Sequence, residues 1–426
     1  MEQQVSLKNN DRPVVLIGAT MWWPLSARLA MALIRHGCRV SAVCPPRHPL
    51  RFVRGIEGLY PYKGPALRRA ITASRPDIVV PCDDGVVWQL HSLHGIHPDV
   101  RLLIERSLGP PEMYPTIRSR GRVLLAAAEL GIRVPPTETL NSEQQLGGWC
   151  AETAAVLKLD GTWGGTGVEI AHSPGEALAA FRRMAKPQGA SVAWKRSLVN
   201  RDPFALWAWR NREEPRVTIQ QFIPGRPANT MFACWQGEVL SIVTVEVVSA
   251  QGTTGAATVV RLIHNAEIAE AARLIARRFR LNGFHGLDFV LESGTGAAYL
   301  IELNPRSTQL GHLRLPGQGD LAGVFSAKLK GEDPPLEGDP ITSDTVAFFP
   351  QAFSWNPQSP YLHRGYHDVP WEEPGLLREL LREPWPDRQW LARLYHFFRP
   401  PKRLAEVQFD EACPGVTVES MKAAPP

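Results

Sequence analysis

Residues 286–306 read GLDFVLESGTGAAYLIELNPR, two apolar runs on either side of a segment rich in glycine. This pattern predicts a β-hairpin that turns at residues 293–296. Because side chains alternate between the two faces of a strand, Glu302 and Asn304 are expected to project to the same side. Asp288, on the partner strand, can reach that side from an adjacent position. The hairpin therefore predicts a group of two carboxylates and one amide oxygen.

A group of this kind is suited to Mg²⁺, or to Mn²⁺, with waters and substrate phosphates as the remaining ligands. Apolar residues flank the acids on both strands, which indicates a packed hairpin and makes unpaired carboxylates costly. A cation is their natural partner, and Arg306, two positions beyond Asn304, could hold a second anion beside it. An Asp–Glu pair alone would be typical of a solvated surface, so the apolar flanks are what favour the metal site.

Two segments upstream have the composition of a nucleotide site. Lys158 precedes the glycine-rich residues 161–167, GTWGGTG, whose backbone N–H groups could close on phosphate oxygens. This order differs from the Walker pattern, in which Gly-Lys-Ser/Thr ends the loop, and a flexible hairpin turn remains the alternative. Residues 220–225, QQFIPG, form a strand end that could contact an adenine edge, although such a sequence is also typical of an ordinary edge strand.

The surrounding sequence predicts an α/β protein in several parts. Strand–helix alternation over 14–115 indicates a small doubly wound α/β lobe, preceded by a disordered lead at 1–13. Residues 116–335 combine a helix at about 119–131 with β-rich stretches, and residues 336–426 are rich in proline and tryptophan.

The last of these parts holds two further features. His363, His367 and Asp368 form an H-x-x-x-H-D string that could bind a metal, although Pro370 and the loop-like composition favour a packed connector. Residues 387–403 predict a basic, aromatic helix. We expect this helix to pack on the rest of the protein, with a membrane or partner surface as the alternative.

Composition excludes several classes of protein. With 426 residues, 44% of them hydrophobic and 21% charged, the chain is typical of a globular protein of several domains. No uncharged apolar run approaches the ~18–20 residues that span a bilayer, so no integral membrane segment is expected. Six scattered cysteines predict neither a zinc site nor a disulfide framework, which favours a cytoplasmic location. The net charge of +5 is spread without a basic stripe, which argues against nucleic-acid binding.

Taken in order, three segments resemble the ATP-grasp superfamily, which includes biotin carboxylase, the large subunit of carbamoyl phosphate synthase and many carboxylate–amine ligases. The segments are VLKLDGTWGGTGVEIAHS, TIQQFIPGR and GFHGLDFVLESGTGAAYLIELNPR. The resemblance covers roughly residues 14–330. It implies an α/β fold in which the doubly wound N-terminal lobe is followed by a two-lobed α+β ATP-grasp domain and a C-terminal extension.

The resemblance also implies roles for individual residues. Asp288, Glu302 and Asn304 would be the metal ligands, and Arg306 would contact the substrate carboxylate or an acyl phosphate. Arg261 matches a position where relatives often place a basic or polar catalytic side chain. The residues expected to bind ATP are Arg120, Lys158, Gly164, Gly165, Thr166, Gly167, Gln220, Gln221 and Ile223.

The activity implied is that of an ATP-dependent ligase. A small-molecule carboxylate would be activated by Mg-ATP as an acyl phosphate and passed to an amine, which forms a C–N bond. Relatives are often dimers, so a homodimer is an expected assembly. The alternative is an ATP-binding module that regulates a partner without ligating anything, which the intact acidic group and Lys158 disfavour. The sequence identifies neither the carboxylate nor the amine.

Overall fold

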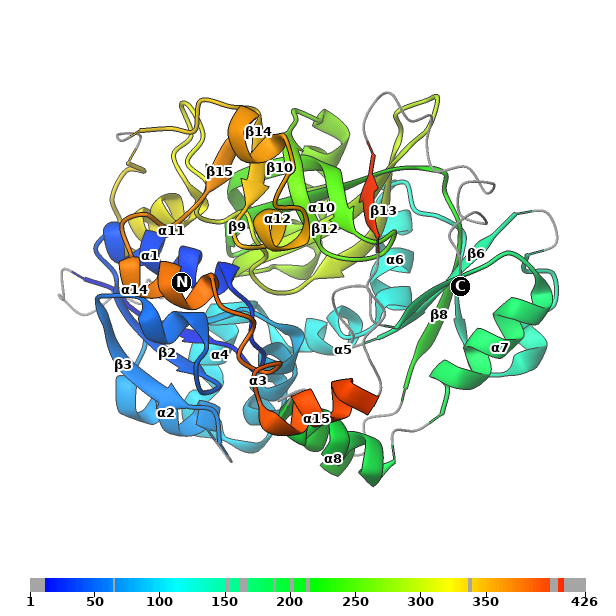
Figure 1. The fold of residues 1–426 in the computed structure, drawn as a ribbon, viewed down its shortest axis with the longest axis horizontal. Helices are drawn as coiled ribbons and strands as arrows, with labels where there is room; N and C mark the ends of the chain where they lie inside the picture. Colours follow the sequence, from blue (N-terminus) through cyan, green and yellow to red (C-terminus); the bar gives the residue numbers. More distant parts are fainter. Residues whose placement is uncertain are drawn as a thin grey trace, which may run out of the picture.

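The computed structural model describes residues 12–63, 66–150, 153–160, 167–186, 189–199, 203–211, 215–335, 339–398 and 405–409 (Figure 1). These residues form a parallel sheet, a small antiparallel sheet and a large, mostly antiparallel sheet, with helices packed against them. The predicted α/β class is confirmed. No helix in the described part of the chain is both long and apolar enough to cross a membrane.

The N-terminal lobe is built on the parallel sheet, whose strand order is β3-β2-β1-β4. Val15 and Ile17 of β1 pack toward α1 while Leu16 packs with α2, α3 and α4, so the strand is apolar on both faces. The chain moves outward through β2 and β3 and returns to pair β4 with the free edge of β1. The carboxyl ends of β1 and β4 therefore form a switch point, where sheets of this kind bind ligands. The elements are β1 (Val14–Gly18), α1 (Leu25–Arg35), β2 (Arg39–Cys44), η1 (Pro49–Phe52), β3 (Ile56–Pro61), α2 (Ala66–Ser74), β4 (Ile78–Pro81), α3 (Asp84–Ile96), η2 (Pro98–Val100) and α4 (Arg101–Leu108).

The small sheet has the strand order β5-β8-β6-β7 and is antiparallel throughout. Helix α7 covers it, because Phe181 and Met184 pack with Leu157 and Ile219 of the strands. The helix predicted at 119–131 is α6, which leads into this sheet. The elements are η3 (Pro111–Met113), α5 (Tyr114–Ile117), α6 (Arg120–Glu129), β5 (Thr137–Leu140), η4 (Glu143–Leu146), β6 (Ala155–Leu159), β7 (Val168–Ala171), α7 (Pro174–Met184), α8 (Ala190–Leu198), α9 (Pro203–Arg210) and β8 (Val217–Gln221).

The large sheet has the strand order β13-β12-β9-β10-β11-β14-β15, and β16 pairs with β10. The predicted hairpin at 286–306 is confirmed as the pair of strands β12 and β13. Helix α10 packs on one face of the sheet, where Ile275 and Phe279 contact the cluster that holds Phe232 and Phe289. The elements up to residue 335 are β9 (Gly225–Trp235), β10 (Glu238–Gln251), β11 (Ala257–Leu262), α10 (Ala266–Phe279), β12 (Gly283–Glu292), β13 (Ala298–Asn304) and α11 (Leu321–Lys330).

The region predicted as a C-terminal extension supplies further strands to this same sheet. Strand β14 pairs with β11, β15 runs parallel to β14, and β16 pairs with β10. The predicted basic, aromatic helix is α15, which lies beside α8 (Figure 1); its Tyr395 hydroxyl accepts a hydrogen bond from Lys195 Nζ at 2.7 Å. The elements are β14 (Thr345–Phe348), α12 (Gln351–Trp355), α13 (Tyr361–Arg364), β15 (Tyr366–Asp368), α14 (Pro374–Leu380), α15 (Trp390–Phe398) and β16 (Glu406–Gln408).

His363, His367 and Asp368 do not gather into a metal site. The His367 ring lies edge-on to Phe349, with 5.6 Å between centroids. Asp368 instead accepts hydrogen bonds from two residues elsewhere in the chain. Among the described residues, no group of three or more His, Cys, Asp or Glu side chains is arranged to hold a metal ion. His363 lies in the short helix α13, and His367 and Asp368 lie in β15 of the large sheet, so the loop-like connector that the composition favours is not what forms here.

Asp368 belongs to a buried ionic group that ties the N-terminal lobe to the C-terminal strands. Its carboxylate accepts from Arg28 Nη2 of α1 at 2.6 Å and pairs with His312 Nε2 at 2.7 Å. The side chains of Arg28 and Asp368 are 6% and 0% exposed. Burial acts to raise the pKa of Asp368, but the charges of His312 and Arg28 outweigh it and leave the pKa at about 2.

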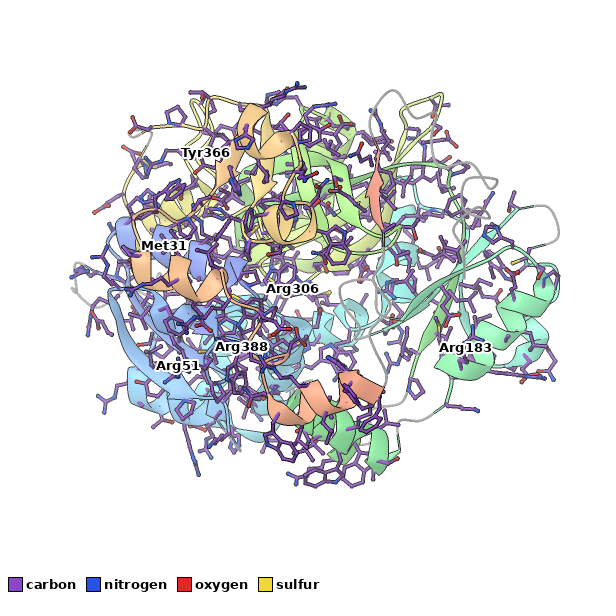
Figure 2. The ribbon with its side chains drawn as sticks, in the orientation of Figure 1. Met31, Arg51, Arg183, Arg306, Tyr366 and Arg388 are labelled. Atoms are coloured by element: carbon purple, nitrogen blue, oxygen red, sulfur yellow. The ribbon has the colours of Figure 1, made fainter. Side chains whose placement is uncertain are left out.

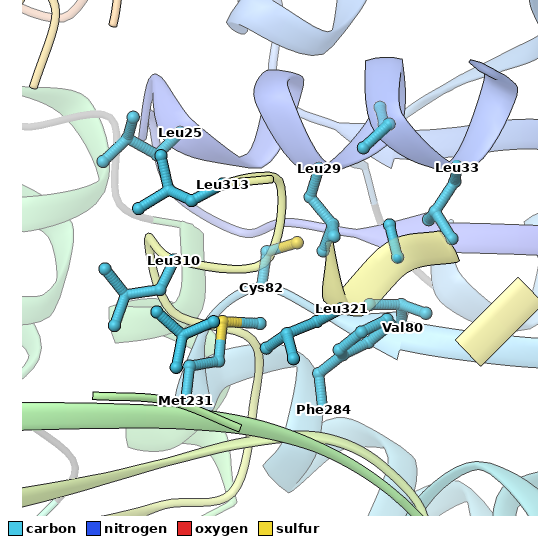
Figure 3. Close-up of a cluster of buried hydrophobic side chains, with 14 of the residues drawn as sticks. Leu25, Leu29, Leu33, Val80, Cys82, Met231, Phe284, Leu310, Leu313 and Leu321 are labelled. Atoms are coloured by element: carbon cyan, nitrogen blue, oxygen red, sulfur yellow. The ribbon is translucent and has the colours of Figure 1, made fainter. Parts of the chain in front are cut away.

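The N-terminal lobe and the large sheet share one hydrophobic core (Figure 3). Leu29 and Leu33 of α1 belong to the same buried cluster as Leu321 of α11, Phe284 of β12 and Met231 of β9. Burying each such side chain stabilises the fold by about 1.5–3 kcal/mol. The lobe and the sheet are therefore packed as one body, which fixes the walls of the space between them.

Gly225 stands at the start of β9, where the chain leaves the small sheet and meets β12. A Cβ atom on this residue would collide with the backbone carbonyl of Leu291. We therefore expect Gly225→Ala to lower the free energy of unfolding by about 1–3 kcal/mol, measured by denaturant unfolding. Gly175→Ala is the matched control, because no atom lies within 4 Å of its added Cβ. Equal stability of the two variants would contradict the predicted clash.

Candidate active site

A cavity of about 400 Å³ lies between the parallel sheet, the small sheet and the large sheet. Its lining comes from the small sheet, from β12 and β13, from the loops after β1 and β4, and from the C-terminal segment. Figure 2 shows Arg306, one of these lining residues, near the middle of the molecule. The predicted site residues on the cavity wall are Arg120, Lys158, Gln220, Gln221, Ile223, Asp288, Glu302, Asn304 and Arg306.

The predicted metal ligands Asp288, Glu302 and Asn304, here called the acidic group, lie on neighbouring strands. Asp288 of β12 lies directly across from Glu302 of β13, and Gly286 lies across from Asn304. The Asp288 carboxylate accepts hydrogen bonds from Asn304 Nδ2 at 3.0 Å and from Asn229 Nδ2 at 2.6 Å. Burial, and then the negative charge of Glu302, raise the pKa of Asp288. The register of the hairpin therefore brings Asp288, Glu302 and Asn304 together, as the sequence predicts.

Two buried cations face these acids. Arg120, at the start of α6, donates to Glu302 Oε1 at 2.6 Å and to Asp160 Oδ1 at 3.3 Å. Lys158 Nζ lies 3.5 Å from the carbonyl oxygen of Ile301. Burial acts to raise the pKa of Glu302, but the charges of Arg120 and Lys158 outweigh it, so the pKa is lowered. Burial and the charge of Arg120 lower the pKa of Lys158 to about 8.

The donor set on the hairpin fits a hard divalent cation. Two carboxylates and an amide oxygen are ligand types that Mg²⁺ takes together with water and phosphate oxygens. The pKa of Asp288 is raised although that of Glu302 is lowered, so Asp288 is the acid whose negative charge a bound cation would stabilise. Asp288, Glu302 and Asn304 are therefore the residues that would hold Mg²⁺ or Mn²⁺.

Arg306 is fixed between the hairpin and the N-terminal lobe. Its Nη2 donates to Asn304 Oδ1 at 3.1 Å, and its Nε donates to Asp84 Oδ2 at 3.1 Å. Asp84 begins α3, so the N-terminal lobe orients a guanidinium that faces the cavity. A planar guanidinium held in this way is suited to a carboxylate or a phosphoryl oxygen. The sequence analysis did not identify Asp84 as a site residue. Its position shortly after the parallel strand β4 is the feature that could have indicated it.

The small sheet supplies the opposite wall of the cavity. Gln220 and Gln221 end β8, and the chain continues along the wall through Ile223. Gln220 is buried, and its Nε2 donates to Thr137 Oγ1 at 3.3 Å. Its amide oxygen is therefore the part of the side chain left for an adenine amine, which is the role that the resemblance implies.

The glycine-rich loop is described only at its end. Gly167 has a φ of 80°, and its carbonyl oxygen accepts a hydrogen bond from Leu159 N at 2.8 Å, which closes the β6–β7 hairpin. Gly167 is not one of the residues that line the cavity. Gly164, Gly165 and Thr166 lie outside the described residues.

Arg261 is placed away from the other predicted site residues. Its Nη1 donates to Glu246 Oε1 at 2.9 Å, and Arg261 lies across from Glu246 in the β10–β11 ladder. Glu246 lies in turn across from Ala228, which belongs to the core beneath α10. Arg261 therefore faces the α10 side of the sheet and does not line the cavity, so the structure does not support the expected catalytic role.

The loops at the switch point of the N-terminal lobe also reach the cavity, and sequence reasoning did not identify them. Asp83, after β4, accepts from Thr20 N at 2.5 Å, from Thr20 Oγ1 at 3.0 Å and from Val86 N at 3.0 Å. Burial raises the pKa of Asp83 to about 6. This carboxylate holds the loop after β1, which carries Trp22 and Trp23 onto the cavity wall.

A protein-family model for the ATP-grasp domain matches residues 185–309, a stretch that includes β8, β9 and the acidic hairpin. The chain carries an ATP-grasp domain. The resemblance seen in the sequence is thereby confirmed. The matched stretch includes seven of the predicted site residues on the cavity wall, which are Gln220, Gln221, Ile223, Asp288, Glu302, Asn304 and Arg306. A search of the curated proteins finds no match.

Solved structures share the ATP-grasp fold at low sequence identity. The N5-carboxyaminoimidazole synthetase of Staphylococcus aureus, complexed with ADP, is 12% identical with a TM-score of 0.53, over 77% of this chain and 81% of that chain. The L-amino acid ligase of Bacillus licheniformis is 16% identical with a TM-score of 0.54, over 78% and 79%. The biotin carboxylase domain of the Hydrogenobacter thermophilus 2-oxoglutarate carboxylase is 13% identical with a TM-score of 0.53, over 77% and 71%. At these identities the likeness establishes the fold, and the chemistry has to be argued from the residues of this chain.

Proposed function

We propose that the protein is an ATP-dependent ligase that joins a small-molecule carboxylate to an amine. The observation that carries the proposal is a single cavity in which Arg120 and Lys158 face Asp288, Glu302 and Asn304. Buried cations suit the phosphates of ATP, and the hard oxygens suit the divalent cation that accompanies them. Structures of the same fold carry the names synthetase, ligase and carboxylase, which is consistent with this chemistry.

ATP would lie between the small sheet and the hairpin. Val156 and Ile170 offer an apolar surface to the adenine, while the backbone beside Ile223 and the amide oxygen of Gln220 offer partners at its edge. Lys158 lies further toward the hairpin, where it would meet the phosphates. The nucleotide would thus span from the strands of the small sheet to the acidic group.

The residues of the cavity would act mainly by positioning the reactants. Arg306 would hold the substrate carboxylate so that one of its oxygens attacks the γ-phosphorus of ATP. The bond from that phosphorus to the β–γ bridging oxygen breaks, and ADP leaves as an acyl phosphate forms. The amine nitrogen then adds to the acyl carbon, phosphate departs with the linking oxygen, and the nitrogen loses a proton. A divalent cation on the acidic group would supply charge neutralisation for the phosphates.

An acyl-phosphate trap tests this proposal against the alternative of a regulatory ATP-binding module. Hydroxylamine intercepts acyl phosphates as hydroxamates, so it can stand in for an unidentified amine. The protein is incubated with Mg-ATP, hydroxylamine and a panel of carboxylates, and phosphate and hydroxamate are both measured. We expect equal amounts of the two products with at least one acid. Binding of ATP without either product, for every acid in the panel, would favour the regulatory module.

Lys158→Met is expected to weaken the binding of ADP by roughly 10–100-fold, since a hydrogen bond to a charged partner contributes about 1.5–3 kcal/mol. Calorimetric titration with ADP and Mg²⁺ measures this change. Lys328→Met is the matched control, because Lys328 is exposed on α11 and does not line the cavity. Unchanged affinity in the Lys158 variant, with its melting temperature preserved, would contradict the assignment of this lysine to the phosphates.

A further inference from the structure

Away from the small sheet, the cavity has a second end where several apolar side chains lie on the wall. Trp23, Val247, Ala250, Leu310 and Phe409 line it, and all pack in the core cluster shared by the N-terminal lobe and the large sheet. The acidic group stands on β12 and β13, whereas Val247 stands on β10, two strands from β12 in the sheet. At the usual strand spacing this separation is about 10 Å. None of these residues has a part in the proposed binding of ATP.

The walls at this end are held by hydrogen bonds rather than left as loose loops. Asp83 fixes the loop that carries Trp23, through its bonds from Thr20 and Val86. On the other side, the backbone N–H of Phe409 donates to the carbonyl oxygen of Val248 at 2.9 Å. Strand β16, just before Phe409, pairs with β10. The C-terminal segment therefore seats an aromatic ring on the cavity wall.

Six charged residues are among the described lining residues, and the proposed function assigns Arg120, Lys158, Asp288 and Glu302 to ATP and its cation. The two that remain are Arg306 and Asp83. Both oxygens of Asp83 already accept hydrogen bonds from the protein. Arg306 donates three hydrogen bonds, to Asp84, Ser307 and Asn304. A guanidinium has five N–H donors, so Arg306 keeps donors for an anion that enters the cavity.

We propose that this end of the cavity selects a carboxylate that bears a bulky apolar side chain, either aromatic or branched aliphatic. Its carboxylate meets Arg306, and its side chain lies among Trp23, Leu310 and Phe409. The role of the carboxylate as the reacting group rests on the proposed ligase function, whereas the apolar selectivity rests on the walls alone. Small or doubly charged acids leave these walls unfilled or place a second charge against them, and so bind weakly.

Equilibrium binding tests the selectivity without requiring turnover. The full-length protein, with ADP and Mg²⁺ present, is titrated calorimetrically with 3-phenylpropionate and L-leucine, and separately with acetate, glycine and L-aspartate. Burial of the apolar side chain predicts that the first two acids bind roughly 10–100-fold more tightly than the other three. Equal or tighter binding of acetate, glycine or L-aspartate would overturn the inference.

Substitutions of Phe409 test whether the C-terminal segment is responsible for the selectivity toward bulky apolar acids. Phe409→Ala is expected to weaken the binding of 3-phenylpropionate by roughly tenfold or more, and Phe409→Leu by less, because the leucine refills part of the space. Trp371→Ala is the control, since Trp371 is 72% exposed and lies off the cavity wall. Retained affinity in a folded Phe409→Ala variant would show that this ring does not form the subsite. If bulky acids bind selectively but no acid yields hydroxamate, the subsite stands and the ligase proposal fails.

Discussion

Glu302→Gln is expected to lower the rate of ATP-dependent phosphate release by roughly a thousandfold. The substitution keeps the size of the side chain and removes the negative charge that would bind the cation beside Asp288. Charge stabilisation by a bound metal is worth several kcal/mol in a transition state. Each 1.36 kcal/mol corresponds to a factor of ten in rate, so a loss of about 4 kcal/mol gives this figure. Phosphate release is measured with the best acid of the panel over a range of Mg²⁺ concentrations.

Glu292→Gln is the matched control on the same hairpin. Glu292 ends β12, where its carboxylate accepts a hydrogen bond from Thr295 Oγ1 at 2.6 Å, and it does not line the cavity. Its variant should keep both the rate and the Mg²⁺ dependence. Melting temperatures of both variants separate a catalytic effect from unfolding. If the Glu302→Gln protein is folded and releases phosphate at an undiminished rate, the acidic group is not the metal site.

Asp368→Asn is expected to lower the free energy of unfolding by about 3–5 kcal/mol, which is the usual cost of breaking a buried ion pair from one side. Arg28 and His312 would then face a neutral amide in place of the carboxylate that now lies 2.6 Å and 2.7 Å away. The other acid near Arg28 is Glu372, at 3.4 Å with a half-exposed side chain, and it replaces little of the lost charge.

Two further variants show whether this cost comes from the unpaired charge. Asp333→Asn makes the same chemical change at an exposed position and should leave stability within about 0.5 kcal/mol of the starting protein. Combining Arg28→Met with Asp368→Leu removes both charges and should recover part of the loss, because apolar replacements of buried pairs are often neutral. A double variant as unstable as Asp368→Asn would contradict this origin. Denaturant unfolding measures all three.

The ion pairs of Asp368 also predict how the free energy of unfolding changes at low pH. The folded-state pKa of Asp368 is about 2, below the ordinary value of about 4 expected in the unfolded chain. Its contribution is therefore fully present above about pH 4 and is lost as the pH falls through 2. We expect the stability difference between the starting protein and Asp368→Asn to shrink by about 2–3 kcal/mol between pH 6 and pH 2. A difference that stays constant over this range would show that the carboxylate is not held by charge.

Short-range patterns predicted much of the fold. The hairpin of β12 and β13 follows from strand alternation and a glycine turn, and its register places Asp288 across from Glu302. The helix α6 follows from apolar spacing between 120 and 129. Both depend on residues close together in sequence, where propensity and periodicity act directly. The acidic group and Lys158 were predicted for the same reason, since each stands at a recognisable place on a strand.

Contacts between distant segments could not be predicted in this way. Strands β14 and β16 join the large sheet after long excursions of the chain, and no local pattern states which edge a strand will pair with. Arg261 was assigned to the site from its position in a motif, but the register across β10 turns it to the opposite face. The apolar end of the cavity could not be predicted, because Trp23 and Phe409 are far apart in the sequence and come to one core cluster only in the folded chain.

The ion pair between Arg28 and Asp368 also affects how the protein folds during translation. The two residues are 340 positions apart, so Arg28 is synthesised long before its counter-charge exists. Until β15 emerges, close packing of the nascent N-terminal lobe would bury the guanidinium of Arg28 without its partner Asp368. We expect the lobe to stay loosely packed during translation and to reach its final form only when the last strands are released. Ribosome-bound chains that end before residue 366 should therefore be cleaved readily by protease within α1.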